Sequence, residues 1–541
     1  MSTECYPITM LPHVSRLYRE YLAMSERAAD APVRRWYGAE PLAGRWIGKS
    51  LPVAGDASAL ADALEQQSRE FGAGPAAMEN ISRLRSGARV VVTGQQVGLF
   101  GGPLLTLLKA ATSVARAKQA TATTGIEHVP VFWLATEDHD LPEVDHVALP
   151  GKTSVETVKA HMTPHGVQPV GAITLGAEME AALDQASELL GWAPVSELLR
   201  ECYSPREWYT PTLGGAFARL MARLFADEGL IVMDASSRTF HALGASTLRA
   251  AIERADELHG ALAARTAELA VENFHSQVLV AEGSSLLFLI TDAGERLALK
   301  RLPEGGWKAG RHPVSTEELL AILATEPERI SPNALLRPVF QDTILPTAAY
   351  IGGPAEVAYF AQSAVLYEKI LGRITPVLPR LSATLIEPSI AEVMAQHEVS
   401  LPDAMTTTDA LAQRLGARAM PIEGKRKLAA VGNAMDAELT ALIDYMTAMD
   451  ESLGRSASVA GSKMRYQMNR LRRMAATFEL QKESSLRKHA QALTLHLFPE
   501  GHPQERLFGG VWFVARVGEG LIARLVKEAA NLCPGHIVIR L

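Results

Sequence analysis

Two polar loops carry the residues of this sequence whose types and spacing could do chemistry. The first, residues 93–103, is rich in glycine and glutamine and follows a run of valines. The second, Glu137-Asp-His-Asp140, places three carboxylates and one imidazole within four residues, directly after the apolar residues 129–135. A glycine-rich loop that runs into a helix offers backbone amides to an anion, usually a phosphate. A cluster of carboxylates and an imidazole can bind cations or transfer protons.

The glycine-rich loop is expected to bind the phosphates of a nucleotide. Its glycines would allow a ligand to approach the backbone, and its glutamines supply amide donors and acceptors. The loop is neither a P-loop, because no Lys-Ser/Thr pair ends it, nor a G-x-G-x-x-G fingerprint. Alternatively, the glycines only permit tight packing of a strand on a helix. The predicted binding residues of this loop are Thr93, Gly94, Gln95, Gln96, Gly98, Gly101 and Gly102.

The acidic loop is expected to serve the reacting groups. Three neighbouring carboxylates repel one another unless a cation, an amine or protonation relieves the repulsion. The loop could recognise a substrate ammonium, hold Mg²⁺ together with nucleotide phosphates, or provide His139 as a general base. Alternatively, it is a solvated loop that caps a helix. We predict Asp138, His139 and Asp140 as catalytic and Glu137 as substrate-binding. No permanent metal is predicted, because the chain lacks HExxH and no cysteine lies nearby.

Two later segments could complete the site. Arg337 could bind a carboxylate or phosphate through two guanidinium nitrogens, although a surface salt bridge would explain it as well. Residues 344–351 predict another strand, and Glu356 and Tyr359 could face the same cleft from the helix that follows it. Alternatively, Glu356 only stabilises that helix N-terminus. The predicted binding residues of these segments are Arg337, Gln341, Asp342, Gly353, Glu356 and Tyr359.

The elements around the two loops predict a parallel α/β sheet. Residues 89–93 and 129–135 read as strands, and a helix between them begins near Pro103, so the three form a βαβ unit. In open parallel sheets, ligands bind beyond the carboxyl ends of the strands. The sheet is interrupted twice: the first insertion lacks a clear strand, and the second holds a long helix followed by strands. The predicted organisation is a Rossmann-like core of residues 1–150, 206–240 and 334–423, insertions at 151–205 and 241–333, a coiled-coil arm at 424–490, and a segment at 491–541 that rejoins the core.

The arm is predicted to be a pair of antiparallel helices separated by residues 452–461. Apolar residues follow a heptad spacing on both helices, which is typical of a coiled coil. The pair could be a local hairpin or a dimerisation arm, and the basic face of its second helix could instead bind RNA. The seam consists of Leu428, Val431, Met435, Leu442, Tyr445 and Met449 on the first helix and Met464, Met468, Leu471, Ala475 and Phe478 on the second.

The composition is ordinary for a soluble enzyme. The 541 residues are too many for one hydrophobic core, and the net charge of −7 gives no reason to expect nucleic acid or an acidic membrane as a partner. The three cysteines, Cys5, Cys202 and Cys533, are far apart, so we expect no disulfide framework and a cytoplasmic protein. The first residues are neither basic nor followed by an apolar run, so no signal peptide is expected.

Five motifs resemble those of the cysteine ligases of bacillithiol biosynthesis. They occur in the family's order, and the resemblance runs from about residue 6 to the C-terminus. The motifs are Gly94-Gln-Gln-Val-Gly-Leu-Phe-Gly-Gly-Pro103, Glu137-Asp-His-Asp140, Leu335-Leu-Arg-Pro-Val-Phe-Gln-Asp-Thr-Ile-Leu-Pro346, Gly352-Gly-Pro-Ala-Glu-Val-Ala-Tyr359 and Pro503-Gln-Glu-Arg506.

The resemblance implies a ligase that joins L-cysteine to glucosaminyl-malate through an amide bond, and a homodimer formed by the coiled coil. The glycine-rich loop resembles the place where class I aminoacyl-tRNA synthetases bind ATP, so ATP is the implied nucleotide and Mg²⁺ a candidate ion beside it. The sequence leaves two alternatives open. One is a metal-dependent hydrolase centred on the acidic loop, and the other is an RNA-binding protein that uses the basic arm.

Overall fold

The computed structural model of the protein divides into two compact units. The described residues are 4–25, 32–42, 44–47, 55–163, 166–191, 193–206, 209–303 and 305–541. The first unit contains residues 1–149, 156–384 and 505–539, and the second contains 150–155, 385–504 and 540–541. Residues 385–423, predicted as part of the core, therefore group with the helical arm instead.

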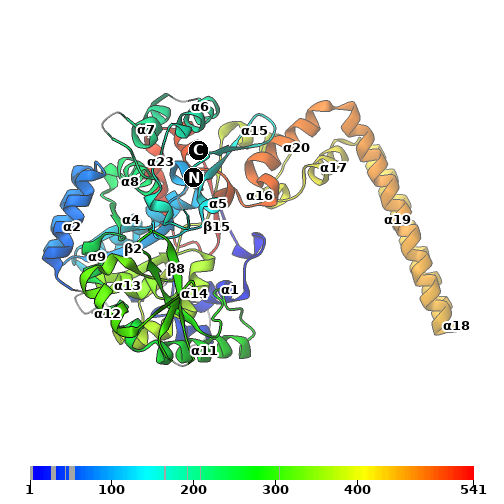
Figure 1. The fold of residues 1–541 in the computed structure, drawn as a ribbon. Coiled ribbons are helices and arrows are strands. Elements are labelled where there is room, and N and C mark those ends of the chain that lie inside the picture. Colours follow the sequence, from blue (N-terminus) through cyan, green and yellow to red (C-terminus); the bar gives the residue numbers. More distant parts are fainter. Residues whose placement is uncertain are drawn as a thin grey trace. The chain divides into compact units, whose positions relative to one another are not determined.

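The first unit is built on a parallel sheet of five strands in the order β13-β12-β2-β3-β6 (Figure 1). The predicted parallel α/β core is confirmed. Neighbours in this sheet come from distant parts of the chain, because both insertions lie between strands that the sheet brings together. The strands are β2 (Arg89–Gln96), β3 (His128–Ala135), β6 (Ile231–Asp234), β12 (Thr347–Gly352) and β13 (Val377–Pro379).

Helix α4 (Leu105–Thr124) is largely buried beside this sheet. It packs against β2 and β3 and also contacts α22 (Gly510–Val517) and α23 (Gly520–Ala529). A helix covered on several sides is apolar nearly all round. The charge-free run before Lys109, the first charged residue after Arg89, consists of the buried strand β2, the glycine-rich loop and only the first turn of α4. Other helices of the unit are α2 (Ala57–Glu70), α3 (Pro75–Arg85), α8 (Leu213–Leu224), α13 (Arg337–Ile344) and α14 (Pro354–Leu371).

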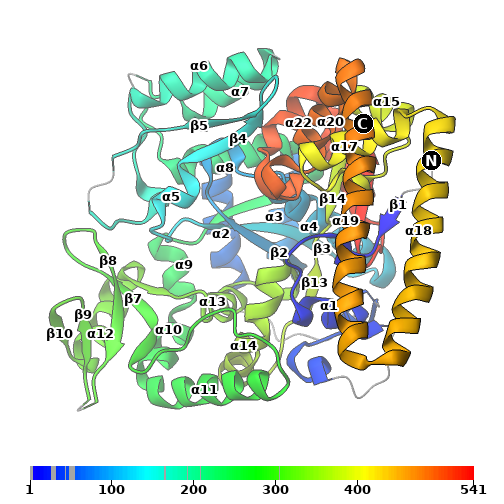
Figure 2. The same ribbon diagram turned by 90° about the vertical axis from the view of Figure 1, so that its right-hand side faces the viewer.

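Both insertions contain strands. In the first, β5 (Val155–Lys159) pairs with β4 (His146–Pro150), so the prediction that this region lacks a clear strand is wrong. The strand is short and half exposed, which weakens its hydrophobic signal. The second insertion holds an antiparallel sheet in the order β10-β9-β8-β7-β11 (Figure 2). The helices and strands of the second insertion are α9 (Arg238–Leu243), α10 (Ala245–Glu253), α11 (Ala255–Val271), β7 (Ser284–Ile290), β8 (Arg296–Arg301), β9 (Trp307–Ala309), β10 (His312–Val314), α12 (Thr316–Thr325) and β11 (Ile330–Pro332). The first insertion also contains the helices α6 (Glu178–Leu190) and α7 (Ala193–Tyr203).

Another small sheet joins early and late parts of the chain. Strand β1 (Glu4–Tyr6) pairs antiparallel with β15 (His536–Arg540), which neighbours β14 (Ala383–Ile386). Beside this pairing, Cys5 and Cys533 form a disulfide across a sequence separation of 528. The expectation of a chain without a disulfide is therefore wrong. Long-range strand pairing brings the two thiols together, and cysteine spacing alone contains no sign of it.

The second unit contains the predicted antiparallel helical pair, α18 (Ile422–Met449) and α19 (Glu451–Lys482), seen side by side in Figures 1 and 2. The predicted linker at 452–461 is wrong, because Asp450 alone turns the chain and caps α19 at the Leu453 amide. Glycines 454 and 461 lie inside α19 and let α18 approach closely, at Thr447 and Ile443. The other helices of this unit are α15 (Pro388–Gln396), α16 (Leu401–Ala404), α17 (Thr408–Ala419) and α20 (Ser484–Leu497).

The predicted heptad seam forms only part of the contact between α18 and α19. Met468 of the seam is buried, as is Leu439 outside it, whereas Leu442 and Leu471 of the seam are 53% and 51% exposed. Among the residues that the structure describes, no helix combines the length and the apolar character needed to cross a membrane.

The disulfide should be visible chemically. Peptide mapping without reductant should recover Cys5 and Cys533 in one linked peptide. A bridge that closes so long a loop restricts the unfolded chain, so reduction should lower the free energy of unfolding by about 2–4 kcal/mol. A Cys5→Ser variant should unfold in urea like the reduced wild type, and its unfolding curve should not change when reductant is added. Cys202→Ala, which removes the buried free thiol, should still respond to it. A wild-type curve insensitive to reductant would contradict the bridge.

Candidate functional site

A cleft of about 340 Å³ lies beyond the carboxyl ends of β2, β3 and β12. This is the edge at which open parallel sheets bind ligands. Residues from all three strand ends line it, together with Arg337 at the start of α13. The predicted site residues that the fold brings together here are Gly94, Gln95, Gln96, Asp138, Arg337, Gly353, Glu356 and Tyr359.

Lys109, which the sequence analysis did not select, ties two of these loops together. Its side chain is almost fully buried on α4, and its Nζ lies 2.7 Å from Oε2 of Glu356. Nζ also donates to the carbonyl oxygen of Gly94 and, at 3.1 Å, to Oε1 of Gln95. Burial lowers the pKa of Lys109, while the neighbouring carboxylate of Glu356 opposes that shift. A single charge in a long uncharged stretch was the signal that could have identified it.

Glu356 is the anionic partner in this contact. The backbone amide of Gly353 donates to Glu356 Oε2 at 2.8 Å, and the hydroxyl of Tyr350 donates to Oε1. Burial alone would raise the pKa of Glu356, but Lys109 and the Gly353 amide outweigh it and hold the pKa below its ordinary value. The predicted alternative roles of Glu356 are thus combined, because it caps α14 and also lines the cleft.

Arg337 offers a positive charge that no carboxylate neutralises directly. Its guanidinium donates to Tyr359 Oη at 2.9 Å, to Gln341 Oε1 at 3.1 Å and to Tyr350 Oη at 3.4 Å. Within the described ranges, no carboxylate lies at ion-pair distance from it. Burial opposes the charged form, but Tyr359, Tyr350 and Glu356 raise the pKa of Arg337 above its ordinary value. A half-buried guanidinium held in place by neutral groups is suited to binding an anionic ligand.

A buried ion pair closes another side of the cleft. Arg380 donates to Glu505 twice, at 3.0 and 2.6 Å, and the exposed fractions of the two residues are only 5% and 1%. The same carboxylate accepts the amide of Ala383 at 2.8 Å and the hydroxyl of Ser382 at 3.1 Å. Burial would raise the pKa of Glu505, but Arg380 lowers it to about 2.

His536 on β15 continues this network behind the cleft. Its Nδ1 lies 2.8 Å from Oγ of Ser382, and its Nε2 lies 2.8 Å from Oγ1 of Thr384. Burial lowers the pKa of His536 to about 4, so the ring is neutral at pH 7. The last strand of the chain thereby supports the arginine that faces the ligand space.

The acidic loop is divided between the cleft and its surroundings. Asp138 lines the cleft, and its Oδ2 accepts Gln96 Nε2 at 2.6 Å. His139 is turned to Arg296, with Nδ1 3.3 Å from Nη1, and Asp140 is exposed at the start of a short helix, α5 (Leu141–Val144). Of the three residues predicted as catalytic, the fold brings only Asp138 to the cleft.

Glu137 pairs with a histidine that the sequence analysis did not select. His241 is fully buried, and its Nε2 lies 2.9 Å from Oε1 of Glu137. Its Nδ1 lies 3.1 and 3.0 Å from the carbonyl oxygens of Pro327 and Ile330. Burial would lower the pKa of His241, but Glu137 and the two carbonyls raise it above its ordinary value. Glu137 therefore anchors the second insertion to β3 and does not line the cleft.

Several other predicted residues support the cleft from behind. Thr93 is fully buried and donates to the carbonyl of Ile351 at 2.9 Å. Asp342 is buried, accepts Gln341 Nε2 at 3.1 Å and Tyr367 Oη at 3.0 Å, and has a pKa raised by burial. Gly101 has a φ of +87° and faces Leu220, so it serves the packing of the loop. The predicted binding residues that the fold does not bring to the cleft are Thr93, Gly98, Gly101, Gly102, Glu137, Gln341 and Asp342.

In the part of the chain that the structure describes, no group of three or more His, Cys, Asp or Glu side chains is arranged to hold a metal ion. Four cationic side chains line the cleft, but Lys109 is paired with Glu356 and Arg380 with Glu505, which leaves Arg337 and Arg506 against the carboxylate of Asp138. The arrangement therefore favours anionic small molecules.

Comparison with known proteins agrees with this architecture. The family model for the N-terminal Rossmann-like domain of bacillithiol biosynthesis BshC matches residues 1–381, and the model for its C-terminal coiled-coil domain matches residues 383–541. Relatives named cysteine ligase BshC include those of Koribacter versatilis, 42% identical over 100% of both chains, Solibacter usitatus, 34% over 100% of both, and Chlorobaculum tepidum, 30% over 89% of this chain and 88% of that one. These relatives give no support to the hydrolase or RNA-binding alternatives.

The Lys109–Glu356 pair should dominate the local stability of the site. Removing one partner leaves an uncompensated buried charge, so Lys109→Met or Glu356→Gln should each cost about 3–5 kcal/mol in the free energy of unfolding. The double variant should recover a large part of that loss, as measured by a urea double-mutant cycle. Lys118→Met is the matched control on the same helix, because it breaks an exposed pair with Glu228 and should cost less than about 1 kcal/mol. Single variants no more costly than this control would refute the idea.

Proposed function

Since this chain belongs to the BshC family of cysteine ligases in bacillithiol biosynthesis, we propose that it joins L-cysteine to glucosaminyl-malate through an amide bond, as the last step of that pathway. The observation that supports the proposal is the cleft at the sheet edge, where Arg337 lines the ligand space with no carboxylate paired to it among the described residues. Glucosaminyl-malate carries two carboxylates and cysteine carries one, so both substrates bring negative charge that such a cleft would attract.

Arg337 is the group best placed to bind a substrate carboxylate. It lines the cleft without a carboxylate partner among the described residues, and Tyr359 and Gln341 fix its orientation. Arg380 is engaged with Glu505, and Lys109 with Glu356. These two ion pairs therefore form walls of the cleft and contribute to its electrostatic field, whereas the positive charge of Arg337 is available to bind the ligand.

Amide formation from a free carboxylate is unfavourable in water, so the cysteine carboxyl group must first be activated. We propose ATP for this role, with the side-chain amides of Gln95 and Gln96 and the cations of the cleft fitting its phosphates. Transfer of an adenylyl or phosphoryl group to the cysteine carboxylate would release pyrophosphate or ADP. Attack by the sugar amine would then form the C–N bond and release AMP or phosphate. Mg²⁺ would accompany the nucleotide.

Asp138 is proposed to receive the amine of the sugar. Its carboxylate lies in the cleft and is fixed by Gln96 and by the backbone amide of His139 at 2.7 Å. A carboxylate in this position can orient an ammonium group and accept the proton that the amine must lose before attack. The protein is proposed to act in the cytoplasm, although the Cys5–Cys533 disulfide is unusual for that compartment.

The reaction can be tested directly. Purified protein incubated with glucosaminyl-malate, cysteine and ATP should yield the amide-linked thiol by mass spectrometry, and omission of any one component should prevent it. AMP or ADP in the mixture would identify the activation route. A product formed without ATP would disprove the nucleotide part alone, and no product in the complete mixture would count against the ligase.

Asp138→Asn should lower turnover by about 10²–10⁴-fold, because proton transfer contributes that much in comparable sites. The melting temperature should barely change, because the variant keeps an oxygen that can accept the hydrogen bond of the His139 amide. Asp292→Asn, at a carboxylate that is 91% exposed, is the matched control and should retain full activity. A loss of stability with normal specific activity would instead assign Asp138 a structural role.

The coiled-coil unit is proposed to form a homodimer. Many large apolar side chains are exposed along α18 and α19. Single apolar residues scattered over a surface are normal, but a large exposed apolar surface marks an interaction site. A twofold mate would cover them. The exposed residues include Val431, Leu442, Tyr445, Met449, Val459, Met464, Leu471, Met474 and Phe478.

A Leu442→Asp and Leu471→Asp double variant should sediment as a monomer while the wild type sediments as a dimer. Both side chains are more than half exposed in the single chain, so the helical content measured by circular dichroism should be unchanged. Val271→Asp alters an apolar residue that is 81% exposed outside the arm and should leave the dimer intact. A double variant that remained dimeric would remove the arm as the interface.

A further inference from the structure

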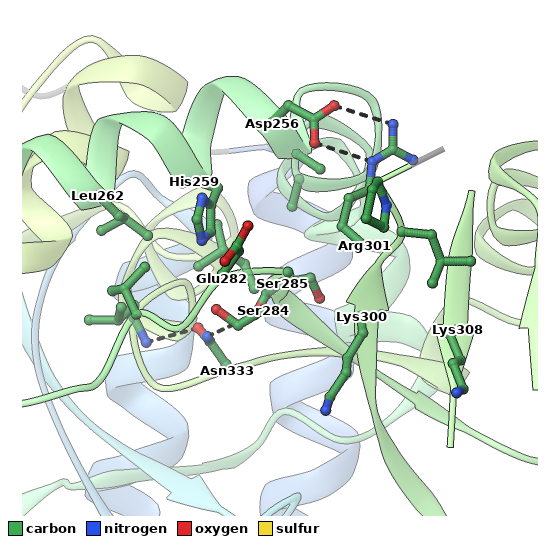
Figure 3. Close-up of a pocket in the computed structure, with 18 of the residues that line it drawn as sticks. Asp256, His259, Leu262, Glu282, Ser284, Ser285, Lys300, Arg301, Lys308 and Asn333 are labelled. Carbon is green, nitrogen blue, oxygen red and sulfur yellow. Dashed lines mark hydrogen bonds and ion pairs between the residues drawn. The ribbon is translucent and has the colours of Figure 1, made fainter. Parts of the chain in front are cut away.

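A second cavity, of about 790 Å³, lies in the insertion formed by residues 241–333 (Figure 3). It shares no lining residue with the cleft at the sheet edge. Its walls come from α11, from the segment that leads into β7, and from β8, β9 and Asn333. A volume of this size is in the range of pockets that bind small metabolites.

A polar row crosses one side of this cavity. Ser284 on β7 is paired in register with Lys300 on β8, and Lys300 is paired with Lys308 on β9. Residues in register on neighbouring antiparallel strands face the same side of a sheet, and like charges in such positions repel. Figure 3 shows both lysine side chains extending to the same side of their strands. Both lysines are exposed, and across the described residues neither ammonium group has a hydrogen-bond or ion-pair partner, so the row carries positive charge that no protein group neutralises.

The rest of the lining offers different chemistry. Arg301 is neutralised at the rim by Asp256, with contacts of 3.2 and 3.3 Å. Glu282 lines the cavity without a partner in the part of the chain that the structure describes. Leu262 is buried in the wall, whereas Leu279 is 86% exposed although it lines the cavity. The cavity thus presents the cations of Lys300 and Lys308, the carboxylate of Glu282 and the exposed apolar side chain of Leu279 to a ligand.

We propose that this cavity is a second ligand site, separate from the cleft, for a small metabolite with a doubly negative end. Lys300 and Lys308 would bind the two negative charges, supplied by a dicarboxylate or by a phosphate. The remainder of the ligand, a body of sugar size, would pack against Leu279 and direct a hydroxyl or amine at Glu282. The choice of test ligands rests on the proposed function, because glucosaminyl-malate has a dicarboxylate end and an amine.

Titration calorimetry of the full chain tests the site with two ligands that share a hexosamine body. Glucosaminyl-malate supplies a dicarboxylate, and glucosamine 6-phosphate supplies a phosphate. For the preferred ligand, a Lys300→Glu and Lys308→Glu double variant should lose at least tenfold in affinity at one site. With glucosaminyl-malate this would appear as a stoichiometry that falls from two to one, because the cleft remains. With glucosamine 6-phosphate, binding should disappear.

The control is a Lys488→Glu and Lys527→Glu double variant. It changes the net charge by the same amount as the cavity variant, at two exposed lysines, and should bind both ligands like the wild type. If the cavity variant binds both ligands as the wild type does, or if the wild type shows no binding that depends on Lys300 and Lys308, the proposal is overturned. Ligase turnover separates this outcome from failure of the proposed function. A cavity variant that turns over normally but binds one ligand fewer supports the second site, whereas absent turnover in the wild type bears on the cleft alone.

Discussion

The architecture of the cleft depends on one buried contact, the ion pair between Lys109 and Glu356. Lys109 belongs to the helix that follows β2, and Glu356 belongs to the helix that follows β12. An ammonium group in an almost fully buried position is unfavourable unless a carboxylate and hydrogen-bond acceptors surround it. The fold supplies both, because Gly94 and Gln95 accept the remaining protons of the ammonium. The two strand-end loops are thereby fixed to each other before any ligand arrives.

The same contact organises the neighbouring side chains. Glu356 holds the hydroxyl of Tyr350, and Tyr350 and Tyr359 surround the guanidinium of Arg337. One negative charge is therefore committed to a buried lysine, and the nearby arginine is left with neutral partners. A site arranged in this way binds anions through a charge whose position is already set, which reduces the reorganisation needed on binding.

The sequence predicts the location of the cleft because the relevant signals are local. Short β-branched runs identify β2 and β3, and the strand-end rule places Gln95, Gln96 and Asp138 together. The lone charge of Lys109 in an uncharged stretch is a visible signal, but the same reasoning assigns no partner to Lys109 or Arg380, because each pairs with a carboxylate far along the chain. Glu505 and Arg506 stand in the motif that carries the family resemblance, yet nothing in their spacing assigns them to this cleft. Such roles emerge only from tertiary contacts.

Glycine and heptad patterns show a different limit. Gly101 is required by its backbone conformation and by its contact with Leu220, and the same residue type would be required for close approach of a phosphate. Composition does not distinguish the two. On the arm, the heptads correctly predict two helices but not which side is shared. The glycines inside α19 form part of that contact together with Leu439 and Met468, and Leu442, Leu471 and Phe478 are left outside it.

The pairing of Arg380 with Glu505 also has a consequence for biosynthesis. The two residues are 125 positions apart, and His536, which supports the same network, is translated later still. At elongation rates of about 5–20 residues per second, Glu505 is synthesised on the order of ten seconds after Arg380. During that time the sheet can be complete while one wall of the cleft carries an unneutralised charge. Ligand affinity should therefore be acquired only after Glu505 and His536 have been synthesised, near the end of translation.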